Sequence, residues 1–162
     1  MNSKSLSVLS AFAISLHILE RFFPSPLPWL RFGFANIVIL LVLLRYGFVS
    51  ALWVNIVRVF VASMIVGTFL GPGFVLSLSG AMVSLAAMGV AHWSTDRLSA
   101  FGLSVIGAFF HSLAQLAVAQ VLFVKNLRAV LIISPVVLMI SLLTGALNGL
   151  VVLQIIKRMR SG

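Results

Sequence analysis

The side chains of this sequence that could do chemistry lie inside apolar stretches. Arg58 is in the middle of the stretch 48–69, and Asn55 is one turn earlier on the same helical face. If the stretch crosses a membrane, an arginine at its centre costs about 3 kcal/mol on insertion scales, so it should face the protein interior. There it either contacts a ligand or counter-ion, or is satisfied by carbonyl groups of neighbouring helices.

Two further pairs have helical spacing. His17 and Glu20 are three residues apart, and His111 and Gln115 are four apart, so each pair shares a helical face. A histidine and a glutamate could ligate a metal, but two ligands do not make a site, and we predict none. An interhelical hydrogen bond or an interfacial anchor is the alternative for this pair. Asn36, like other amides in apolar helices, serves either as interhelical glue or as a ligand contact.

The catalytic inventory is nearly empty. The sequence has two acidic residues, Glu20 and Asp96, and no cysteine. It has no thiol nucleophile, no plausible Ser/His/Asp set and no phosphate-cradling loop with a glycine–lysine pair before Ser or Thr. We therefore predict no catalytic residue, no enzyme activity and no cofactor.

The amino-acid composition indicates that the protein is surrounded by lipid and not by water. Hydrophobic residues make up 62% of the 162 residues and charged ones 8%, whereas a soluble domain is roughly a quarter charged. The net charge is +9, but the basic residues stand singly or in pairs between apolar runs, as topology determinants do. Membrane lipid, and not nucleic acid, is the expected partner.

Gly, Pro and polar residues divide the chain into apolar segments. They predict an all-α, polytopic membrane bundle of about six transmembrane helices, forming a single domain over 1–162. The first is a retained helix, because no small-x-small cleavage site follows it. The second is short of the roughly 20 residues that span a bilayer, so it recruits part of 27–31 or lies partly buried or tilted. The expected helices cover 5–23, 32–44, 48–69, 74–93, 99–124 and 130–156.

Loop charges orient the bundle. With both termini in the cytoplasm of a bacterial cell, the inner segments carry Lys4, Arg45, Arg97, Lys157, Arg158 and Arg160, and the outer ones Arg21, Arg31, Lys125 and Arg128. The excess favours cytoplasmic termini in the inner membrane. Counting 1.5 Å per residue then places most polar side chains in the outer half, and fewer, Asn148 among them, in the inner half. A pocket that opens outward is the simplest interpretation, with chance clustering as its competitor. Its expected ligand contacts are Glu20, Arg31, Asn36, Arg58, His111 and Gln115.

Small residues recur every four positions on two segments. Such rows let helix backbones approach closely. Ser7, Ala11 and Ser15 form one row on 5–23, and Ser141, Gly145 and Gly149 form another on 130–156. We expect the second row to pack within the bundle. The first row is a candidate contact with a second membrane protein.

Three stretches carry a family resemblance. They are Leu19-Glu20 leading to Pro24-x-Pro26-Leu27-Pro28-x-x-Arg31-x-Gly33-x-Ala35-Asn36; Gly102-Leu103-Ser104-Val105-Ile106-Gly107-Ala108 leading to His111 and Gln115; and Leu143-Thr144-Gly145. With Arg58 between them, the chain resembles the Gx transporter family, commonly labelled "heptaprenyl diphosphate synthase component I". That family is similar to the substrate-binding (S) components of energy-coupling-factor transporters.

The resemblance implies a six-helix bundle with an outward-facing pocket. It also implies that the first helix packs small residues against a transmembrane coupling subunit, although Ser7 and Ser15 depart from a plain alanine row. The synthase label conflicts with the chemistry, because prenyl chain elongation needs several carboxylates to hold Mg²⁺.

Two functions remain. The leading one is a membrane substrate-binding component for uptake of a small molecule, energised by a partner because the chain has no nucleotide site. The alternative is a structural or quinone-associated subunit of a larger membrane redox complex.

Overall fold

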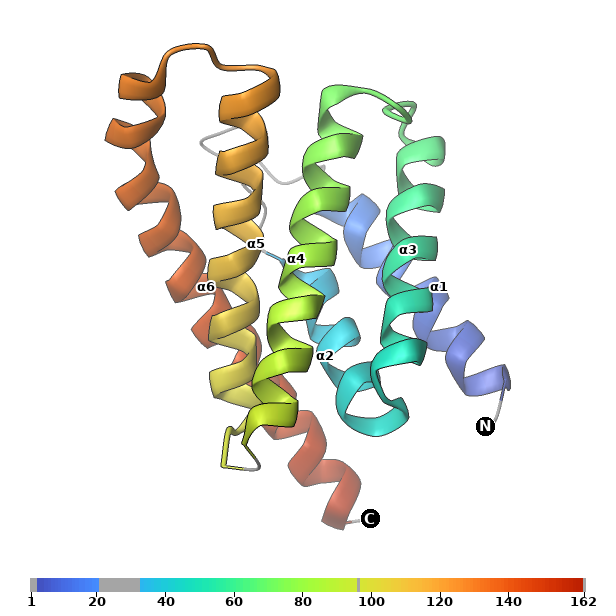
Figure 1. The fold of residues 1–162 in the computed structure, drawn as a ribbon. Helices are drawn as coiled ribbons and strands as arrows, with labels where there is room; N and C mark the ends of the chain where they lie inside the picture. Colours follow the sequence, from blue (N-terminus) through green and yellow to red (C-terminus); the bar gives the residue numbers. More distant parts are fainter. Residues whose placement is uncertain (1–2, 21–32, 96, 162) are drawn as a thin grey trace.

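The structure is a computed structural model that describes residues 3–20, 33–95 and 97–161. In these ranges the chain forms six helices and no strand. Both termini lie at one end of the bundle (Figure 1), which we call the terminal end. The helices are α1 (Ser3–Leu19), α2 (Phe34–Tyr46), α3 (Phe48–Ile65), α4 (Pro72–Ser94), α5 (Ala100–Leu122) and α6 (Leu127–Ser161).

Glycine, proline and a serine cap mark several of the helix ends. Gly47 separates α2 from α3 with a φ of 84°, and Gly67 follows α3 with a φ of 70°, a region open to glycine and strained for most other residues. Pro72 begins α4, where its missing N–H has no intrahelical partner to lose. Ser99 caps α5, since its Oγ accepts a hydrogen bond from the Gly102 N–H at 3.3 Å. All six predicted segments are therefore helices, with ends shifted by a few residues.

Four helices, α3, α4, α5 and α6, are long and apolar enough to cross a membrane, while the described parts of α1 and α2 are shorter. Large apolar side chains such as Trp53, Val90, Val121 and Ile132 lie exposed on the outside of the bundle. With so few charged residues, such a surface fits lipid better than water. The chain is a multi-pass membrane protein.

Helix α2 is the short central helix. It has 13 residues and packs against each of the other five helices. Six of its side chains are buried: Ala35, Val38, Ile39, Leu40, Val42 and Leu43. The sequence left open how so short a helix is accommodated. In the structure α2 begins at Phe34 and is buried inside the bundle. The segment 27–31 lies outside the described residues.

Helices α5 and α6 pack closely through small residues. A Cβ atom on Gly145 would lie 2.6 Å from the Ala108 Cβ, and one on Gly149 would lie 2.8 Å from the Phe101 Cα. The Ser104 hydroxyl donates to the Gly145 carbonyl at 2.8 Å. The row on α6 therefore packs within the bundle, as predicted.

Helix α1 buries one face and leaves the other uncovered. Ala13 is fully buried, and His17 and Glu20 are almost so. This face packs on α2 and α3. Ser7, Ala11 and Ser15 are exposed on the opposite side, beside Val8 and Phe12. The small-residue row thus lies outside this chain's own core.

Candidate functional site

A small polar cavity lies where five helices converge. It is lined by His17, Glu20, Gly33, Asn36, Arg58, Ser77 and His111. About 10 Å³ is open to the centre of a water molecule, which is room for about one water. Four of the six predicted ligand contacts, Glu20, Asn36, Arg58 and His111, are therefore brought together. They come from different parts of the sequence, and the fold alone makes them neighbours.

Arg58 is the centre of the hydrogen bonding here. It is 3% exposed, as the cost of an arginine in lipid predicts. Its Nη2 donates to Asn55 Oδ1 at 2.7 Å, and both Nη atoms donate to Asn36 Oδ1 at 3.3 Å. Asn55 Nδ2 in turn donates to the Ala81 carbonyl of α4 at 2.8 Å. The guanidinium thereby links α2, α3 and α4 through amide oxygens.

Glu20 binds the beginning of α2. One oxygen of its carboxylate accepts a hydrogen bond from the Ala35 N–H at 3.3 Å. The first N–H groups of a helix have no intrahelical acceptor, and the helix dipole favours a negative charge there. Since α2 begins inside the protein, a buried carboxylate takes the place of water. Glu20 is 6% exposed.

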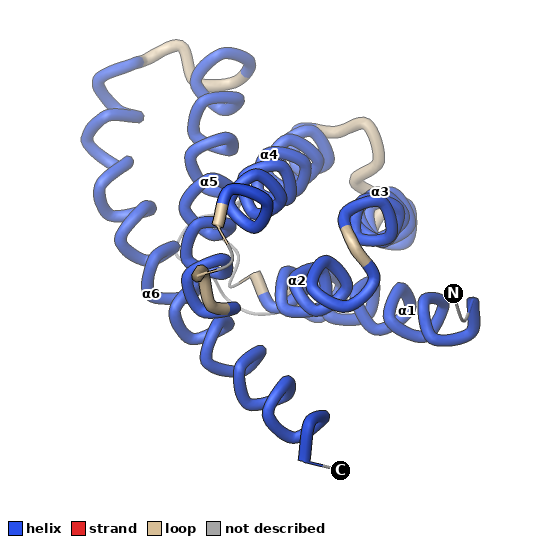
Figure 2. Tube along the Cα trace, turned by 60° about the horizontal axis from the view of Figure 1, so that its bottom comes forward, coloured by secondary structure: helices blue, strands red, loops and turns tan. Residues whose placement is uncertain are grey.

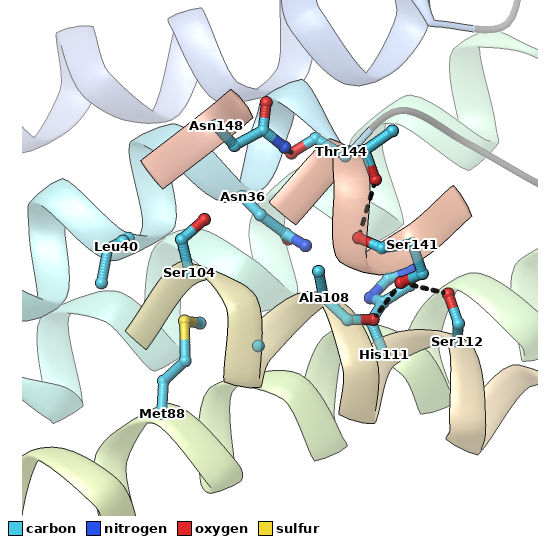
Figure 3. A pocket seen from close by; sticks show the side chains of 12 residues that line it. Asn36, Leu40, Met88, Ser104, Ala108, His111, Ser112, Ser141, Thr144 and Asn148 are labelled. Carbon is cyan, nitrogen blue, oxygen red and sulfur yellow. Dashed lines mark hydrogen bonds between the residues drawn. The ribbon is translucent and has the colours of Figure 1, made fainter. Parts of the chain in front are cut away.

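A second cavity adjoins the first and shares Gly33, Asn36 and His111 with it. It leaves about 20 Å³ to the centre of a water molecule. Figure 3 shows its α6 side chains, Ser141, Thr144 and Asn148, facing those of α5. The Ser112 hydroxyl donates to Ser141 Oγ at 2.9 Å, and Ser141 donates to the Ala108 carbonyl at 2.6 Å.

The sequence analysis did not group the α5 and α6 polar residues of this second cavity into one site. Asn148 was expected in the inner half, yet its Nδ2 donates to the Gly33 carbonyl at 3.2 Å, beside Asn36. Counting residues from the helix ends had separated Gly33 from Asn148, whereas the hydrogen bond makes them neighbours. The signal that could have found the hydroxyl cluster was Ser141, which begins the small-residue row on α6.

Of the two remaining predicted contacts, the structure describes only Gln115. Gln115 is buried on α5, and its Nε2 donates to the Leu76 carbonyl of α4 at 3.3 Å. Its side chain is not among those that line either cavity. Arg31 and the proline-rich segment 24–31 lie outside the described residues. In the described ranges, no three His, Cys, Asp or Glu side chains are grouped so as to hold a metal ion.

The arrangement suits binding. It offers one guanidinium, one carboxylate, two imidazoles and several amides and hydroxyls in a water-poor interior, where hydrogen bonds to charged groups are strong. A polar molecule held there would meet donors and acceptors from several helices at once. As it stands, the cluster is closed, because the two cavities admit only single waters.

Comparison with known proteins identifies the family. No curated protein and no solved structure matches the chain. A family model described as "Heptaprenyl diphosphate synthase component I" matches residues 9–155. The match contains both cavities and nearly the whole helical bundle. The chain belongs to this family.

Proposed function

We propose that this chain is the substrate-binding component of a membrane transporter that takes up a small polar molecule. The observation that carries the proposal is the convergence of Glu20, Asn36, Arg58 and His111 on one buried cavity. Ionisable residues within a membrane bundle are costly and most often mark a substrate or ion path. Family membership and an apolar helical bundle fit a transporter of this type.

In this proposal Arg58 and Glu20 recognise the charged or strongly polar groups of the ligand. Asn36 and His111 then fix its orientation. Binding exchanges the present hydrogen bonds of Arg58 to Asn36, at 3.3 Å, for hydrogen bonds to the ligand. The ligand also needs space, so entry requires the closed cluster to open.

We propose that the chain serves a transporter and does not catalyse prenyl chain elongation. Of its two acidic residues, Glu20 already binds the Ala35 N–H, and Asp96 follows α4 outside the described residues. A Mg²⁺-diphosphate site needs several convergent carboxylates. The word synthase in the family description is therefore not carried over to this chain.

We further propose that a second membrane protein supplies the energy. The sequence has no phosphate-binding loop, and in this proposal the energy comes from a partner that hydrolyses a nucleoside triphosphate. The row Ser7, Ala11 and Ser15 is the proposed contact, because its side chains are exposed on this chain and small residues allow close helix packing. The proposed location is the bacterial inner membrane, with both termini in the cytoplasm.

The closed packing is the observation that favours the alternative. With room for only single waters, the polar residues would serve as interhelical hydrogen bonds. The chain would then be a structural or quinone-associated subunit of a membrane redox complex. Ligand retention separates the two functions.

The test is mass spectrometry of small molecules released from the purified protein. A polar metabolite should be enriched with the wild-type chain and lost with Arg58→Leu. Arg128→Leu is the matched control, because Arg128 is exposed at the start of α6, away from both cavities. Equal metabolite profiles for all three proteins, after gentle purification from cells, would contradict the proposal.

A further inference from the structure

A third hollow shares no lining residue with the two polar cavities. It is a groove of about 940 Å³, near the upper end of the roughly 300–1,000 Å³ typical of ligand pockets. Helices α1 and α6 form its two sides, and α2 lies between them with the beginning of α5. In the described residues α1 and α6 do not pack against each other, so the groove is open along their length.

The groove lies at the terminal end of the bundle. Figure 2, which brings that end forward, shows α2 between α6 and α1, with the last turns of α6 extending past α2. The lining residues are the first turns of α1, the last turn of α2, the first residue of α5 and the last turns of α6. The groove therefore lies between the ends of α1 and α6, with the last turn of α2 as its floor.

Most of the lining is apolar. Leu41 and Leu44 of α2 and Leu153 of α6 are partly buried against the core. Val8 and Ile156 line it from either side, and Val8 is 68% exposed. Acyl chains of lipids are about as apolar as leucine side chains, so they can pack against such a surface.

The mouth of the groove is basic. Arg45, at the end of α2, is exposed and lines the groove; its Nη1 lies 3.6 Å from Met159 Sδ as a weak donor. Lys157 and Arg158 are exposed on the same turns of α6 as Met159. Glu20, by contrast, lines the polar cavity and not this groove. A groove with an apolar floor and a cationic rim complements an anionic headgroup with an acyl tail.

We propose that this groove is a binding site for an anionic phospholipid. The acyl chain lies between α1 and α6 over Leu41, Leu44 and Leu153. The phosphate is bound by Arg45, the cationic side chain that lines the groove. Basic pockets between transmembrane helices bind anionic headgroups in this way, and a long arginine side chain reaches the headgroup region from a helix end. The site is separate from the polar cavities and does not depend on the proposed function.

The experiment is native mass spectrometry of the full chain, released from detergent after addition of phosphatidylglycerol or phosphatidylcholine. We expect phosphatidylglycerol to bind more tightly to the wild type. Arg45→Gln should weaken it about fivefold, as loss of one basic residue near a headgroup predicts, and leave phosphatidylcholine unchanged. Arg128→Gln, an exposed arginine on another part of α6, is the matched control and should bind as the wild type does.

A second variant tests the apolar part of the groove without touching the core. Val8→Trp should fill the groove and reduce binding of both lipids, because Val8 lines it and is largely exposed. Equal affinity for the two lipids, or an Arg45→Gln protein that binds like the control, would overturn the proposal. Retention of a prenyl diphosphate in preference to phospholipid, or crosslinking of position 8 to a protein partner in membranes, would also overturn it.

Discussion

The carboxylate of Glu20 accepts a hydrogen bond from the Ala35 N–H at 3.3 Å, and so joins the end of α1 to the first turn of α2. Both groups are buried. The hydrogen bond gives one of the first N–H groups of α2 an acceptor inside the protein, where the helix itself offers none. It also places a negative charge at the edge of the cavity that contains Arg58.

Replacing Glu20 tests this link. Glu20→Leu should lower the stability of the fold by about 2 kcal/mol, because it leaves a buried helix end without its charged acceptor. Glu20→Gln keeps an acceptor oxygen and should cost less. Thermal unfolding in detergent measures both. Gln154→Leu is the control, since Gln154 is exposed on α6; equal stability of Glu20→Leu and this control would contradict the role of Glu20.

The contact between α5 and α6 is equally testable. Gly145→Val should destabilise the protein by about 1–3 kcal/mol, because a Cβ there would lie 2.6 Å from the Ala108 Cβ and 3.2 Å from the Ser104 carbonyl oxygen. Ala117→Val adds bulk at an exposed position of α5 and should change little. Unfolding curves of the two variants that coincide would show that the helices are not packed as described.

The topology prediction uses the absence of cysteine from the sequence. Leu27→Cys should react with a membrane-impermeant thiol reagent in whole cells, because the 24–31 segment is expected outside. Ser94→Cys, at the exposed end of α4, should react only in inverted vesicles. The reverse pattern would invert the topology and rule out a cavity that opens outward.

The buried position of Arg58 could be predicted from the sequence, and so could the number and the approximate bounds of the helices. The cost of this arginine in lipid leaves only the interior as a position, and glycine and proline mark where the chain must turn. A lipid environment makes such predictions simpler, because each backbone N–H and C=O group must form its hydrogen bond within a helix.

The relative depth of the polar side chains along the bundle could not be predicted in the same way. Counting 1.5 Å per residue assumes that each helix starts at the membrane boundary and runs straight across. Helix α2 instead begins inside the bundle, and α6 has 35 residues, about 50 Å, which exceeds the thickness of a bilayer. Asn148 and Gly33 therefore meet although the count separates them. Nor could a sequence show that the cavities are closed, because that depends on how side chains of all six helices fit.

Two substitutions at Arg58 separate charge from geometry. Arg58→Leu removes three hydrogen bonds to Asn36 and Asn55, and should reduce ligand retention about tenfold or more while membrane insertion survives. Arg58→Lys keeps the charge but not the planar set of donors, so it should retain an intermediate amount. Full retention by Arg58→Leu, measured as metabolite per mole of protein, would remove Arg58 from the binding site.

The partner prediction has a matched pair of variants on α1. Ala11 is exposed and Ala13 is fully buried, only two residues apart. Ala11→Leu should release a membrane partner and leave unfolding unchanged, whereas Ala13→Leu should damage the fold. If Ala11→Leu lowers stability as much as Ala13→Leu does, the exposed row is part of the bundle's own packing.

The central claim is tested most directly by copurification in mild detergent from the cell that makes the protein. A tagged wild-type chain should bring down a membrane protein together with nucleoside-triphosphate hydrolysis, and the Ala11→Leu chain should bring down neither. Copurification instead with subunits that bear flavin, iron–sulfur clusters or quinone, and without nucleotide hydrolysis, would contradict the account and establish the redox alternative.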